Sequence, residues 1–332
     1  MNAGAARVLE ILRREAGVPR SGEALSRRLG VSRNQIWKHV GALRDLGYGI
    51  EGSPGGGYTL SRLPDRLYPE EIRAGLDTRW LARDVRWLEE TGSTNDVAQQ
   101  LARDGAVHGT VVVAEGQTRG RGRHGRVFFS PRHRNLYTSA VLRPELHVSQ
   151  APTLVLAAAV AVADAVAEAV DDDDAVQIKW PNDVLLGGLK TCGILMELAS
   201  EATRVAHVVL GIGVNLNVER AAFPEEFRAI ATSVAAHRGT PVDRPAFARS
   251  LYGTLESVLD LHAKGGFGAV RPRFEARFRM AGRPVRVRDV GGPELAGRAE
   301  GIDADGALLL RGEGGNVQRV LAGDVTLREE RS

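Results

Sequence analysis

The chain contains, in one predicted loop, Gly116-Gln117-Thr118-Arg119-Gly120-Arg121-Gly122-Arg123-His124-Gly125-Arg126, and about fifty residues later Lys179-Trp180-Pro181-Asn182-Asp183. Four arginines spaced by glycines exceed what a structural turn needs, because one or two glycines supply its positive φ. Guanidinium groups on a pliable backbone can surround an anion from several sides. We therefore predict a loop that closes on phosphate or carboxylate; the alternative is a mobile basic surface loop.

The same loop contains the letters of a dinucleotide-binding fingerprint. Gly120 to Gly125 satisfies G-x-G-x-x-G, but that motif needs a strand directly before it and a helix after it. The predicted strand 110–114 ends several residues earlier, and Val127-Phe128-Phe129-Ser130-Pro131 reads as extended and is stopped by proline. A P-loop is excluded because no Gly-Lys-Ser/Thr follows. Guanidinium groups, rather than a helix N-terminus, are expected to hold the anion.

Composition indicates an ordinary soluble globular protein. Of its 332 residues 43% are hydrophobic and 26% charged, and this length predicts two or three domains. The most apolar run, residues 154–163, is followed by acidic residues and predicts a buried helix rather than a membrane span. No signal-peptide pattern opens the chain. The single cysteine, Cys192, excludes an internal disulfide, favours a cytoplasmic location, and is expected to be a small core residue.

Positive charge is concentrated near the N-terminus. Residues 1–63 hold ten Lys/Arg against five Asp/Glu, a net +5, whereas the remaining 269 residues sum to −2. Such asymmetry indicates a polyanionic partner for the N-terminal segment, most commonly nucleic acid.

This basic segment has the pattern of a winged helix-turn-helix. Helices are predicted over 5–14, 21–29 and from Ser32 onward, and Ser32 with Gln35 predicts a capping box. Residues 48–60 read as a hairpin with a glycine-rich tip, the wing, and Leu63-Pro64-Asp65 marks the exit. A scaffold or protein-binding module is the alternative to DNA binding.

The third helix has one apolar stripe, Ile36, Val40 and Leu43, and a polar, partly basic opposite face. The second helix of such a motif enters the major groove and reads bases from its N-terminal residues. The predicted DNA-binding residues are Arg33, Asn34, Gln35, Lys38 and Arg44, of which Asn34, Gln35 and Lys38 are the base-reading candidates.

Strands and helices alternate after residue 84. Strands are predicted over 85–88, 110–114, 135–142, 176–180 and 207–211, with a hairpin over 184–198 that turns at Gly187-Gly188. Helices are predicted over 93–102, 150–170, 245–262 and 267–279. This order suggests an α+β fold whose sheet is covered on one face.

Five motifs in this region resemble biotin protein ligases when taken in order. They are Ser93-Thr94-Asn95, the Gly-Arg-Gly-Arg loop, Lys179 to Asp183, Lys190-Thr191-Cys192-Gly193-Ile194-Leu195-Met196-Glu197, and Gly211-Ile212-Gly213-Val214-Asn215. With the winged helix ahead, nearly the whole chain resembles the bifunctional biotin ligase and biotin-operon repressor. The resemblance implies that ATP, with Mg²⁺, activates biotin as biotinyl-5′-AMP, and that a lysine of a biotin carboxyl carrier domain accepts the biotin. It also implies repression of biotin-synthesis genes at operator DNA, and a homodimer when biotinyl-AMP is bound.

The resemblance also assigns roles to residues. Lys179, Arg121 and Arg123 are expected to act on the biotin carboxyl group and the α-phosphate, and Ser93, Thr94 and Gln117 suit the ureido ring, although both hydroxyls could instead cap a helix. Asp183 could orient Lys179 or hold Mg²⁺, and both readings stay open. The predicted cofactor-binding residues are Ser93, Thr94, Asn95, Gln117, Gly120, Arg121, Gly122, Arg123, Arg126, Phe128, Lys179, Asn182, Asp183, Lys190, Gly193 and Asn215.

The chain departs from the family at one position. Tryptophan often follows the arginine loop in the family, whereas this chain has Val127-Phe128-Phe129, so Phe128 would supply any stacking on adenine.

The last fifty residues alternate apolar and polar, with turns at Gly291-Gly292-Pro293 and Asp305-Gly306. They resemble the family's SH3-like β-barrel, and Arg328 lies where that barrel can reach the nucleotide. The expected domains are 1–65, 66–281 and 282–332. A lipoate or octanoate ligase of the related fold and a non-catalytic biotin-sensing regulator are the alternative functions; the arginine loop disfavours the first, and intact Lys179 and arginines disfavour the second.

Overall fold

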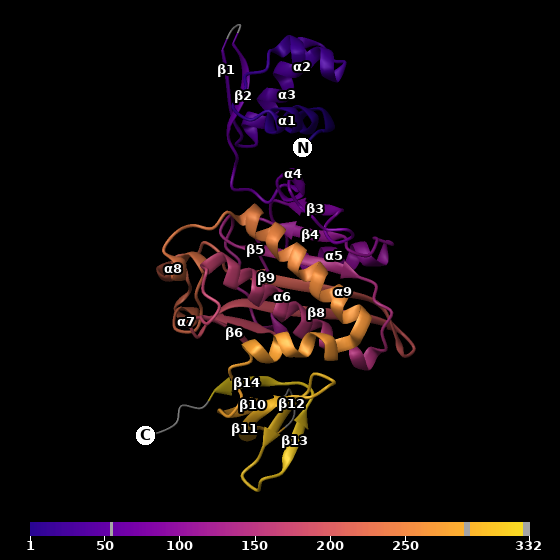
Figure 1. Ribbon diagram of the computed structural model, residues 1–332, viewed down its shortest axis with the longest axis vertical. Helices are drawn as coiled ribbons and strands as arrows, with labels where there is room; N and C mark the ends of the chain where they lie inside the picture. The colour runs from indigo at the N-terminus through magenta and orange to yellow at the C-terminus, as the bar shows by residue number, and fades with distance from the viewer. Residues whose placement is uncertain (54–55, 289–292, 328–332) are drawn as a thin grey trace. The chain divides into compact units, whose positions relative to one another are not determined.

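The computed structural model describes residues 1–53, 56–288 and 293–327, and the chain divides into two compact units, Met1–Arg66 and Leu67–Ser332 (Figure 1). The first unit contains α1 (Ala3–Arg14), α2 (Gly22–Leu29), α3 (Arg33–Asp45) and the hairpin of β1 (Gly49–Ser53) with β2 (Gly57–Arg62). The predicted helix-turn-helix and hairpin are confirmed. The wing tip at residues 54–55 lies outside the described residues.

Helix N-caps and one apolar core stabilise the first unit. Asn2, Ser21 and Ser32 each accept a backbone N–H three residues later, which satisfies a free donor at the start of each helix. The predicted capping box is only half formed: Ser32 caps Gln35, but the Gln35 amide contacts His39 Nε2 at 3.3 Å instead of reaching back. The core side chains that hold the three helices together are Val8, Leu12, Leu25, Ile36, Val40 and Leu43.

The second unit is built on a seven-stranded sheet of order β3-β4-β5-β9-β8-β7-β6. Only β3 and β4 run parallel; the other neighbouring pairs are antiparallel. The strands are β3 (Val85–Leu88), β4 (Val111–Ala114), β5 (Leu136–Leu142), β6 (Val176–Lys179), β7 (Asp183–Leu186), β8 (Leu189–Glu201) and β9 (Arg204–Val214). The predicted β7–β8 hairpin at Gly187-Gly188 is confirmed, while β9 is longer than expected.

Helices cover both faces of this sheet, so the expectation of one covered face was wrong. The larger face packs against α6 (Thr153–Val170) and α9 (Arg244–Arg277), with α4 (Pro69–Arg73) beside α9. On the other face α5 (Thr94–Arg103) buries Ala98 and Ala102 against central strands β4, β5 and β9. The physical reason is strand alternation: in β4, Val111 and Val113 face one side and Val112 the other, so both sides of the sheet centre are apolar.

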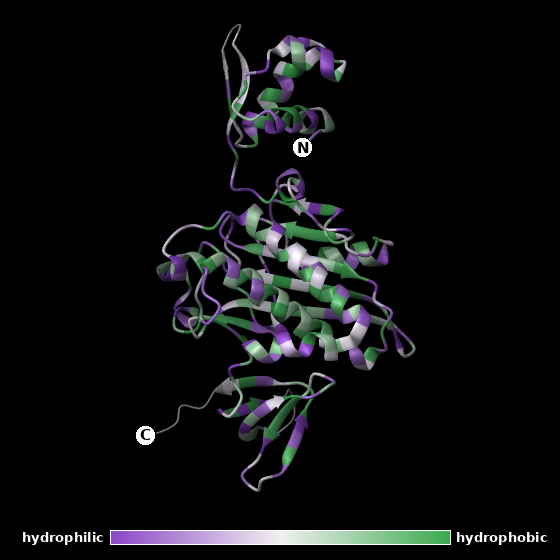
Figure 2. Ribbon diagram, in the orientation of Figure 1, coloured by the Kyte–Doolittle hydropathy of each residue, from purple (hydrophilic) through white to green (hydrophobic). Residues whose placement is uncertain are grey.

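The two long helices, α6 and α9, differ from the prediction in where α6 begins and are interrupted once, in α9. Helix α6 begins at Thr153, after the short turn Val148–Gln150, and not at Gln150 as predicted. Residues 148–170 are apolar (Figure 2) and long enough to span a membrane by length and composition. Of the 18-residue apolar window within this segment, however, 72% is buried inside the protein. Helix α9 is interrupted at Gly266, where φ is 63°, between the two predicted helices.

The C-terminal part is an antiparallel sheet of order β13-β12-β11-β10-β14. Its strands are β10 (Pro284–Arg288), β11 (Leu295–Ile302), β12 (Leu308–Arg311), β13 (Val317–Val320) and β14 (Asp324–Leu327). Within the described ranges β13 and β14 do not pair, so the predicted closed barrel is not seen; Gly291-Gly292 and Arg328 lie outside those ranges. Trp180 Nε1 donates to the Gly306 carbonyl at 3.0 Å, which fixes this sheet beside β6.

A fully buried ion pair joins the end of β4 to the start of α9. The Glu115 carboxylate accepts from Arg244 at 2.9 Å and from the Leu67 backbone N–H at 2.8 Å. Burial by itself would raise the pKa of Glu115, but Arg244 and the hydrogen-bond donors outweigh it and hold that pKa below its usual range.

We expect Glu115→Gln to lower the free energy of unfolding by about 3 to 5 kcal/mol, because Arg244 would keep its buried charge without a carboxylate. The lowered pKa means that the wild-type stabilisation is present above the unfolded-state pKa of Glu115 and is lost as pH falls through the folded-state pKa. The difference in free energy of unfolding between the variant and the wild type should therefore become smaller at acidic pH. Denaturant unfolding at neutral and acidic pH measures this, with exposed Glu145→Gln as control; equal stability of Glu115→Gln and wild type would refute the assignment.

Candidate active site

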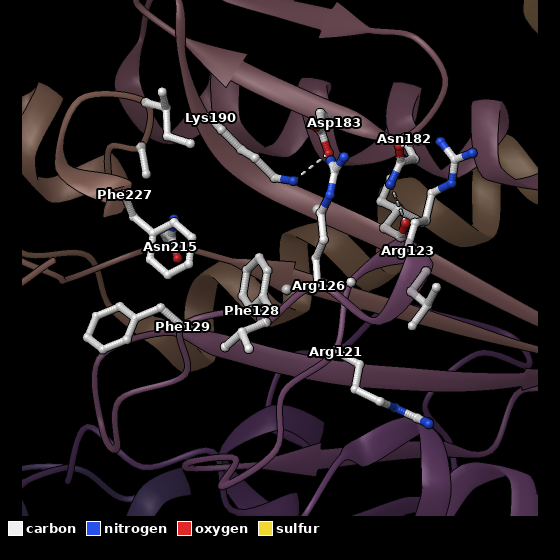
Figure 3. A pocket seen from close by; sticks show the side chains of 18 of the residues that line it. Arg121, Arg123, Arg126, Phe128, Phe129, Asn182, Asp183, Lys190, Asn215 and Phe227 are labelled. Atoms are coloured by element: carbon white, nitrogen blue, oxygen red, sulfur yellow. Dashed lines mark hydrogen bonds and ion pairs between the residues drawn. The ribbon is translucent and has the colours of Figure 1, made fainter. Parts of the chain in front are cut away.

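A cavity of about 730 Å³ lies in the second unit over strands β8 and β9 (Figure 3). All predicted cofactor-binding residues line it except Gly120. A Cβ at Gly120 would lie 2.4 Å from Ser130 Oγ and 2.6 Å from the Phe128 carbonyl oxygen, so this glycine lets the two arms of the arginine loop pack together. Segments far apart in the sequence therefore meet at one site of a size suited to a small-molecule ligand.

The arginine loop folds back on itself as a narrow hairpin. Gly122 N–H donates to the Arg126 carbonyl at 2.7 Å, and Phe128 N–H donates to the Gly120 carbonyl at 2.9 Å. Its tip is a single 3₁₀ turn, Arg123–Gly125, in which His124 has φ 56°. Alternate arginines consequently point in different directions.

Arg123 and Arg126 face the cavity beside strand β14. Arg123 donates to Asn182 Oδ1 at 3.3 Å and to the Gly323 carbonyl at 3.2 Å, and its guanidinium lies 3.5 Å from Asp324. Arg126 lies 2.5 Å from the second oxygen of Asp324. Asp324 was not predicted as a site residue, because an isolated aspartate near the end of the chain shows no motif; it supplies the negative charge that faces these two arginines.

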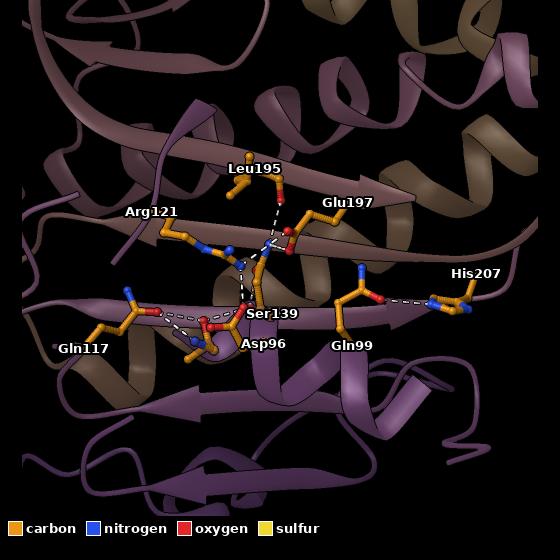
Figure 4. A network of polar contacts seen from close by, with 10 residues as sticks. Asp96, Gln99, Gln117, Arg121, Ser139, Leu195, Glu197 and His207 are labelled. Carbon is orange, nitrogen blue, oxygen red and sulfur yellow. Dashed lines mark hydrogen bonds and ion pairs between the residues drawn. The ribbon is translucent and has the colours of Figure 1, made fainter. Parts of the chain in front are cut away.

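Arg121 points toward α5 and β8 instead of the centre of the cavity (Figures 3 and 4). Its guanidinium lies 2.5 Å from Asp96 and 3.3 Å from Glu197. Glu197 also accepts from the Asn95 amide at 2.8 Å. The structure thus places Arg121 as an anchor of the loop, although its side chain still lines one wall.

A network of neutral polar groups forms the end of the cavity near α5 (Figure 4). Gln117 accepts from the Thr94 backbone N–H at 2.8 Å and from its hydroxyl at 3.1 Å, and Ser139 donates to Thr94 at 2.8 Å. Ser93 occupies the N-cap position of α5 but its side chain makes no capping hydrogen bond. Local capping therefore does not account for the Ser93 hydroxyl, which lines the cavity.

Two lysines, Lys179 and Lys190, also line the cavity. Lys190 Nζ lies 2.7 Å from the Asp183 carboxylate. Lys179, at the end of β6, is half-buried, and no described residue forms an ion pair or hydrogen bond with its ammonium group. Asn182, between them in the sequence, donates to the Ile194 carbonyl at 2.9 Å and accepts from Arg123.

The Phe128 ring packs against the backbone of two glycines in the floor of the cavity. Gly193 and Gly213 are register partners on β8 and β9, and a Cβ on Gly213 would lie 2.6 Å from the Phe128 ring. Tyr137 meets the same ring edge-to-face at 6.4 Å between centroids. These glycines therefore make room for the Phe128 ring against the sheet.

A second aromatic wall was not predicted from the sequence. Phe129, Phe223 and Phe227 cluster with Val218 and Ala231 around η3 (Arg220–Ala222) and α7 (Glu225–Arg228), just before α8 (Val234–Arg238). Phe223, Glu226, Phe227 and Ile230 line the cavity. The aromatic residues of Phe223-Pro224-Glu225-Glu226-Phe227, in an otherwise polar segment, were the available signal.

Several predicted residues are engaged within the protein. Asn215 is buried, donating to the Thr232 carbonyl at 3.2 Å and accepting from Asn135 at 3.1 Å, which leaves little of its amide for a ligand. Asn95 accepts from Ser139 at 2.7 Å as well as donating to Glu197. Cys192 is buried, and burial raises the pKa of its thiol, which confirms a core residue.

No group of three or more metal-ligating side chains occurs among the described residues. Three carboxylates in the described ranges line the cavity: Asp324, which faces Arg123 and Arg126; Glu226, on α7; and Asp183, beside Lys190. A single carboxylate suits Mg²⁺, which commonly takes one or two protein carboxylates and completes its shell with phosphates and water. The donor set therefore fits a nucleotide-bound Mg²⁺ and not a resident metal cage.

On the first unit, Arg33, Asn34 and Lys38 are exposed on α3, and Gln35 is half-buried. Arg44 is exposed, but its guanidinium donates twice to the Ile50 carbonyl, at 2.8 and 3.0 Å. Arg44 therefore ties α3 to the wing strand β1.

Three family models match this chain. Residues 87–215 match the biotin/lipoate A/B protein ligase family, 281–328 the biotin protein ligase C terminal domain, and 5–59 an HTH domain. The chain is 37% identical over 307 residues to the bifunctional ligase/repressor BirA of Bacillus subtilis, covering 92% of this chain and 93% of that protein. It is 34% identical over 311 residues to the Escherichia coli bifunctional ligase/repressor BirA, covering 93% and 92%. Its fold is similar to the Aquifex aeolicus biotin protein ligase in complex with biotin and ATP, with TM-score 0.64, 28% identity, and coverage of 75% and 100%.

Proposed function

The chain belongs to the family of bifunctional biotin protein ligases and repressors, and from this premise we propose how its residues carry out the reaction. The protein is an ATP-dependent biotin-[acetyl-CoA-carboxylase] ligase and a DNA-binding repressor. A biotin carboxylate oxygen attacks the α-phosphorus of ATP, the bond to pyrophosphate breaks, and biotinyl-5′-AMP forms. The amine of a carrier lysine then attacks the acyl carbon, and AMP leaves.

One observation carries the assignment of roles: Arg123, Arg126, Lys179 and Lys190 surround a cavity whose other end is neutral and polar. Both chemical steps gather negative charge at one phosphorus or carbonyl, and preorganised cations stabilise such charge most effectively. The four cations are therefore proposed to bind the phosphate and carboxyl groups. Lys179 and Arg123 act on the reacting centre, and Lys190, held by Asp183, lies beside them.

Arg121 is proposed to bind the biotin carboxylate only after the ligand has entered the cavity. Asp96 and Glu197 both pair with its guanidinium. The biotin carboxylate can replace either partner, because a guanidinium can donate two parallel hydrogen bonds to any carboxylate of suitable geometry. Its catalytic role would therefore follow ligand entry.

The neutral end of the cavity is proposed to bind the ureido ring of biotin. That ring both donates and accepts hydrogen bonds, which matches Ser93, Thr94 and Gln117. Adenine is assigned to the aromatic side, between Phe128 and the wall of Phe129, Phe223 and Phe227. Gly193 and Asn215 border that side, and Asn95, Gly120, Gly122 and Asn182 support the binding groups.

Asp183 is proposed to hold Mg²⁺ together with the nucleotide phosphates. When bound, the ion would neutralise phosphate charge during pyrophosphate departure. The Lys190 ion pair keeps the Asp183 carboxylate in place at the cavity wall.

The partners follow from the family and the domain organisation. A biotin carboxyl carrier domain is the acceptor, and operator DNA binds the helix-turn-helix, with Arg33, Asn34, Gln35, Lys38 and Arg44 as the proposed contacts. We propose domains 1–65, 66–281 and 282–332, the last an SH3-like barrel; the compact unit ending at Arg66 and the C-terminal family match over 281–328 support these boundaries. A cytoplasmic location is proposed from the single buried cysteine, since disulfides are rare in a reducing compartment.

The decisive test of function is transfer of labelled biotin from ATP and biotin to a purified carrier domain. Covalent label on the carrier lysine, dependent on ATP, is expected. Label from lipoate or octanoate in place of biotin would instead support the related acyl ligases.

We propose a homodimer formed through the open edge of β8. Strand β7 pairs only with residues 189–193 of β8, so in the described sheet no strand pairs with the same edge over Leu195–Glu201. Unpaired strand edges readily pair with a second chain. Glu197, on this segment, contacts Arg121 of the arginine loop, so ligand binding and edge pairing share one ion pair.

Biotinyl-AMP is expected to tighten both dimerisation and operator binding, since two recognition helices can then meet successive major grooves. A coupling free energy of about 1 to 3 kcal/mol corresponds to roughly 5- to 150-fold. Sedimentation with and without biotinyl-AMP, alongside DNA titration at fixed salt, measures both. Equal dimer strength and equal DNA affinity in the two states would rule out the switch and leave the ligase activity in place.

A further inference from the structure

Trp37 is exposed on α3 although nothing in the fold requires it there. Its side chain is 61% exposed, and it is the only aromatic among the large exposed hydrophobic side chains of the described residues. The apolar stripe of the same helix, at Ile36, Val40 and Leu43, is fully buried, so the indole is not part of the core. An exposed indole is typical of a surface that packs against another molecule.

Gly41, four residues later, is a second feature that folding does not explain. A glycine inside a helix is unfavourable relative to alanine, because it loses more backbone entropy. A Cβ at Gly41 would meet nothing within 4 Å, so packing does not exclude alanine. Residues four apart share one helix face, so the missing side chain leaves a notch beside the indole.

The charges around Trp37 and Gly41 identify the occupant. Arg33 and Lys38 are exposed next to Trp37, and the surrounding residues 1–63 carry net +5. A polyanion with apolar edges fits this surface, and duplex DNA offers both phosphates and thymine methyl groups. The helix begins at Arg33, with Ser32 as its cap, so Trp37 lies in the second turn from the end that reads bases.

We propose that Trp37 and Gly41 form one DNA-contact surface, in which the indole packs on thymine methyl groups and the Gly41 notch admits the DNA close to the helix backbone. The proposal rests on the repressor function and adds two specificity-determining residues to it. Apolar contact with base edges carries sequence information, whereas Arg33 can supply a phosphate contact that does not. Trp37 should therefore govern selectivity more than total affinity.

Gly41→Ala distinguishes a role in folding from a role in DNA binding, because it should stabilise the helix but weaken DNA affinity. The alanine should slow hydrogen exchange of α3 amides by up to roughly fivefold, since helix propensity improves. The same methyl group should weaken binding several-fold to a duplex that wild-type protein with biotinyl-AMP selects from a random pool. Gly253→Ala in α9 is the matched control: this helical glycine also has nothing within 4 Å, and its replacement should leave DNA binding unchanged.

Trp37→Ala should weaken binding to the selected duplex roughly tenfold or more, while binding to an unselected duplex and the salt slope change little. Val18→Ala is the control, an exposed apolar residue outside α3. Biotin transfer should be unaffected in every variant. Unchanged selectivity of Trp37→Ala, or unchanged affinity of Gly41→Ala, overturns the inference, as does loss of dimerisation in place of DNA binding, which would assign the surface to a second copy. Failure of the wild-type protein to select any duplex would instead overturn the repressor function itself.

Discussion

Replacing Arg123 with glycine is expected to release biotinyl-5′-AMP from the enzyme, so that bystander lysines become biotinylated together with the carrier. Arg123 is the loop arginine whose guanidinium lies among Asn182, the Gly323 carbonyl and Asp324, at the wall proposed for the phosphate. Its loss removes a charge-assisted contact to the adenylate while the ureido end of the cavity remains intact. The adenylate should therefore still form, but dissociate before transfer.

The measurement is biotinylation of an unrelated protein mixed with the enzyme, biotin and ATP, compared with the carrier domain. Arg119→Gly is the matched control, because Arg119 belongs to the same loop, is exposed, and does not line the cavity. Arg119→Gly should label only the carrier. Carrier-specific labelling by Arg123→Gly, at the wild-type rate, would mean that Arg123 does not retain the adenylate.

Replacing a cavity lysine with alanine is expected to slow biotin-dependent pyrophosphate exchange by a factor on the order of 10² or more, because a fixed ammonium group no longer stabilises charge at the α-phosphate. We expect this for both Lys179→Ala and Lys190→Ala. The two differ in their surroundings: Lys190 is paired with Asp183, whereas Lys179 has no such partner among the described residues. Lys190→Ala therefore also removes the ion pair that keeps the Asp183 carboxylate in place at the proposed Mg²⁺ site.

Exposed Lys264→Ala serves as the control and should exchange at the wild-type rate. Near-normal exchange in Lys179→Ala, with a large loss in Lys190→Ala, would move the catalytic role from Lys179 to Lys190. Near-normal exchange in both would remove the lysines from the chemistry and leave the arginines as the catalytic cations.

The sequence of the arginine loop reveals its charge, but only the fold reveals which carboxylates its arginines contact. Four closely spaced arginines repel one another, and the spacing alone indicates an anion in their midst. The folded protein offsets this repulsion with its own carboxylates, Asp96 and Glu197 for Arg121 and Asp324 for Arg123 and Arg126. These carboxylates come from α5, β8 and β14, and no local pattern connects them to the loop.

The sequence by itself determined the features that depend on neighbouring residues. Apolar spacing and caps predicted the three N-terminal helices, the hydrophobic run predicted α6, and the Gly187-Gly188 turn predicted the β7–β8 hairpin, because each rests on backbone preference and side-chain periodicity within a few turns. The motifs also indicated most of the residues that line the cavity.

Only the tertiary structure decided how those residues are used. Three features require contacts between distant segments: the second covered face of the sheet, the hydrogen bond from Arg123 to the Gly323 carbonyl 200 residues away, and the packing of Phe128 on Gly193 and Gly213. Orientation likewise separates Arg121, which is turned toward α5 and β8, from Arg123, which faces the cavity, although they are two residues apart. Such contacts follow from the packing of the whole chain, because strand pairing and burial select one arrangement among many that the local sequence permits.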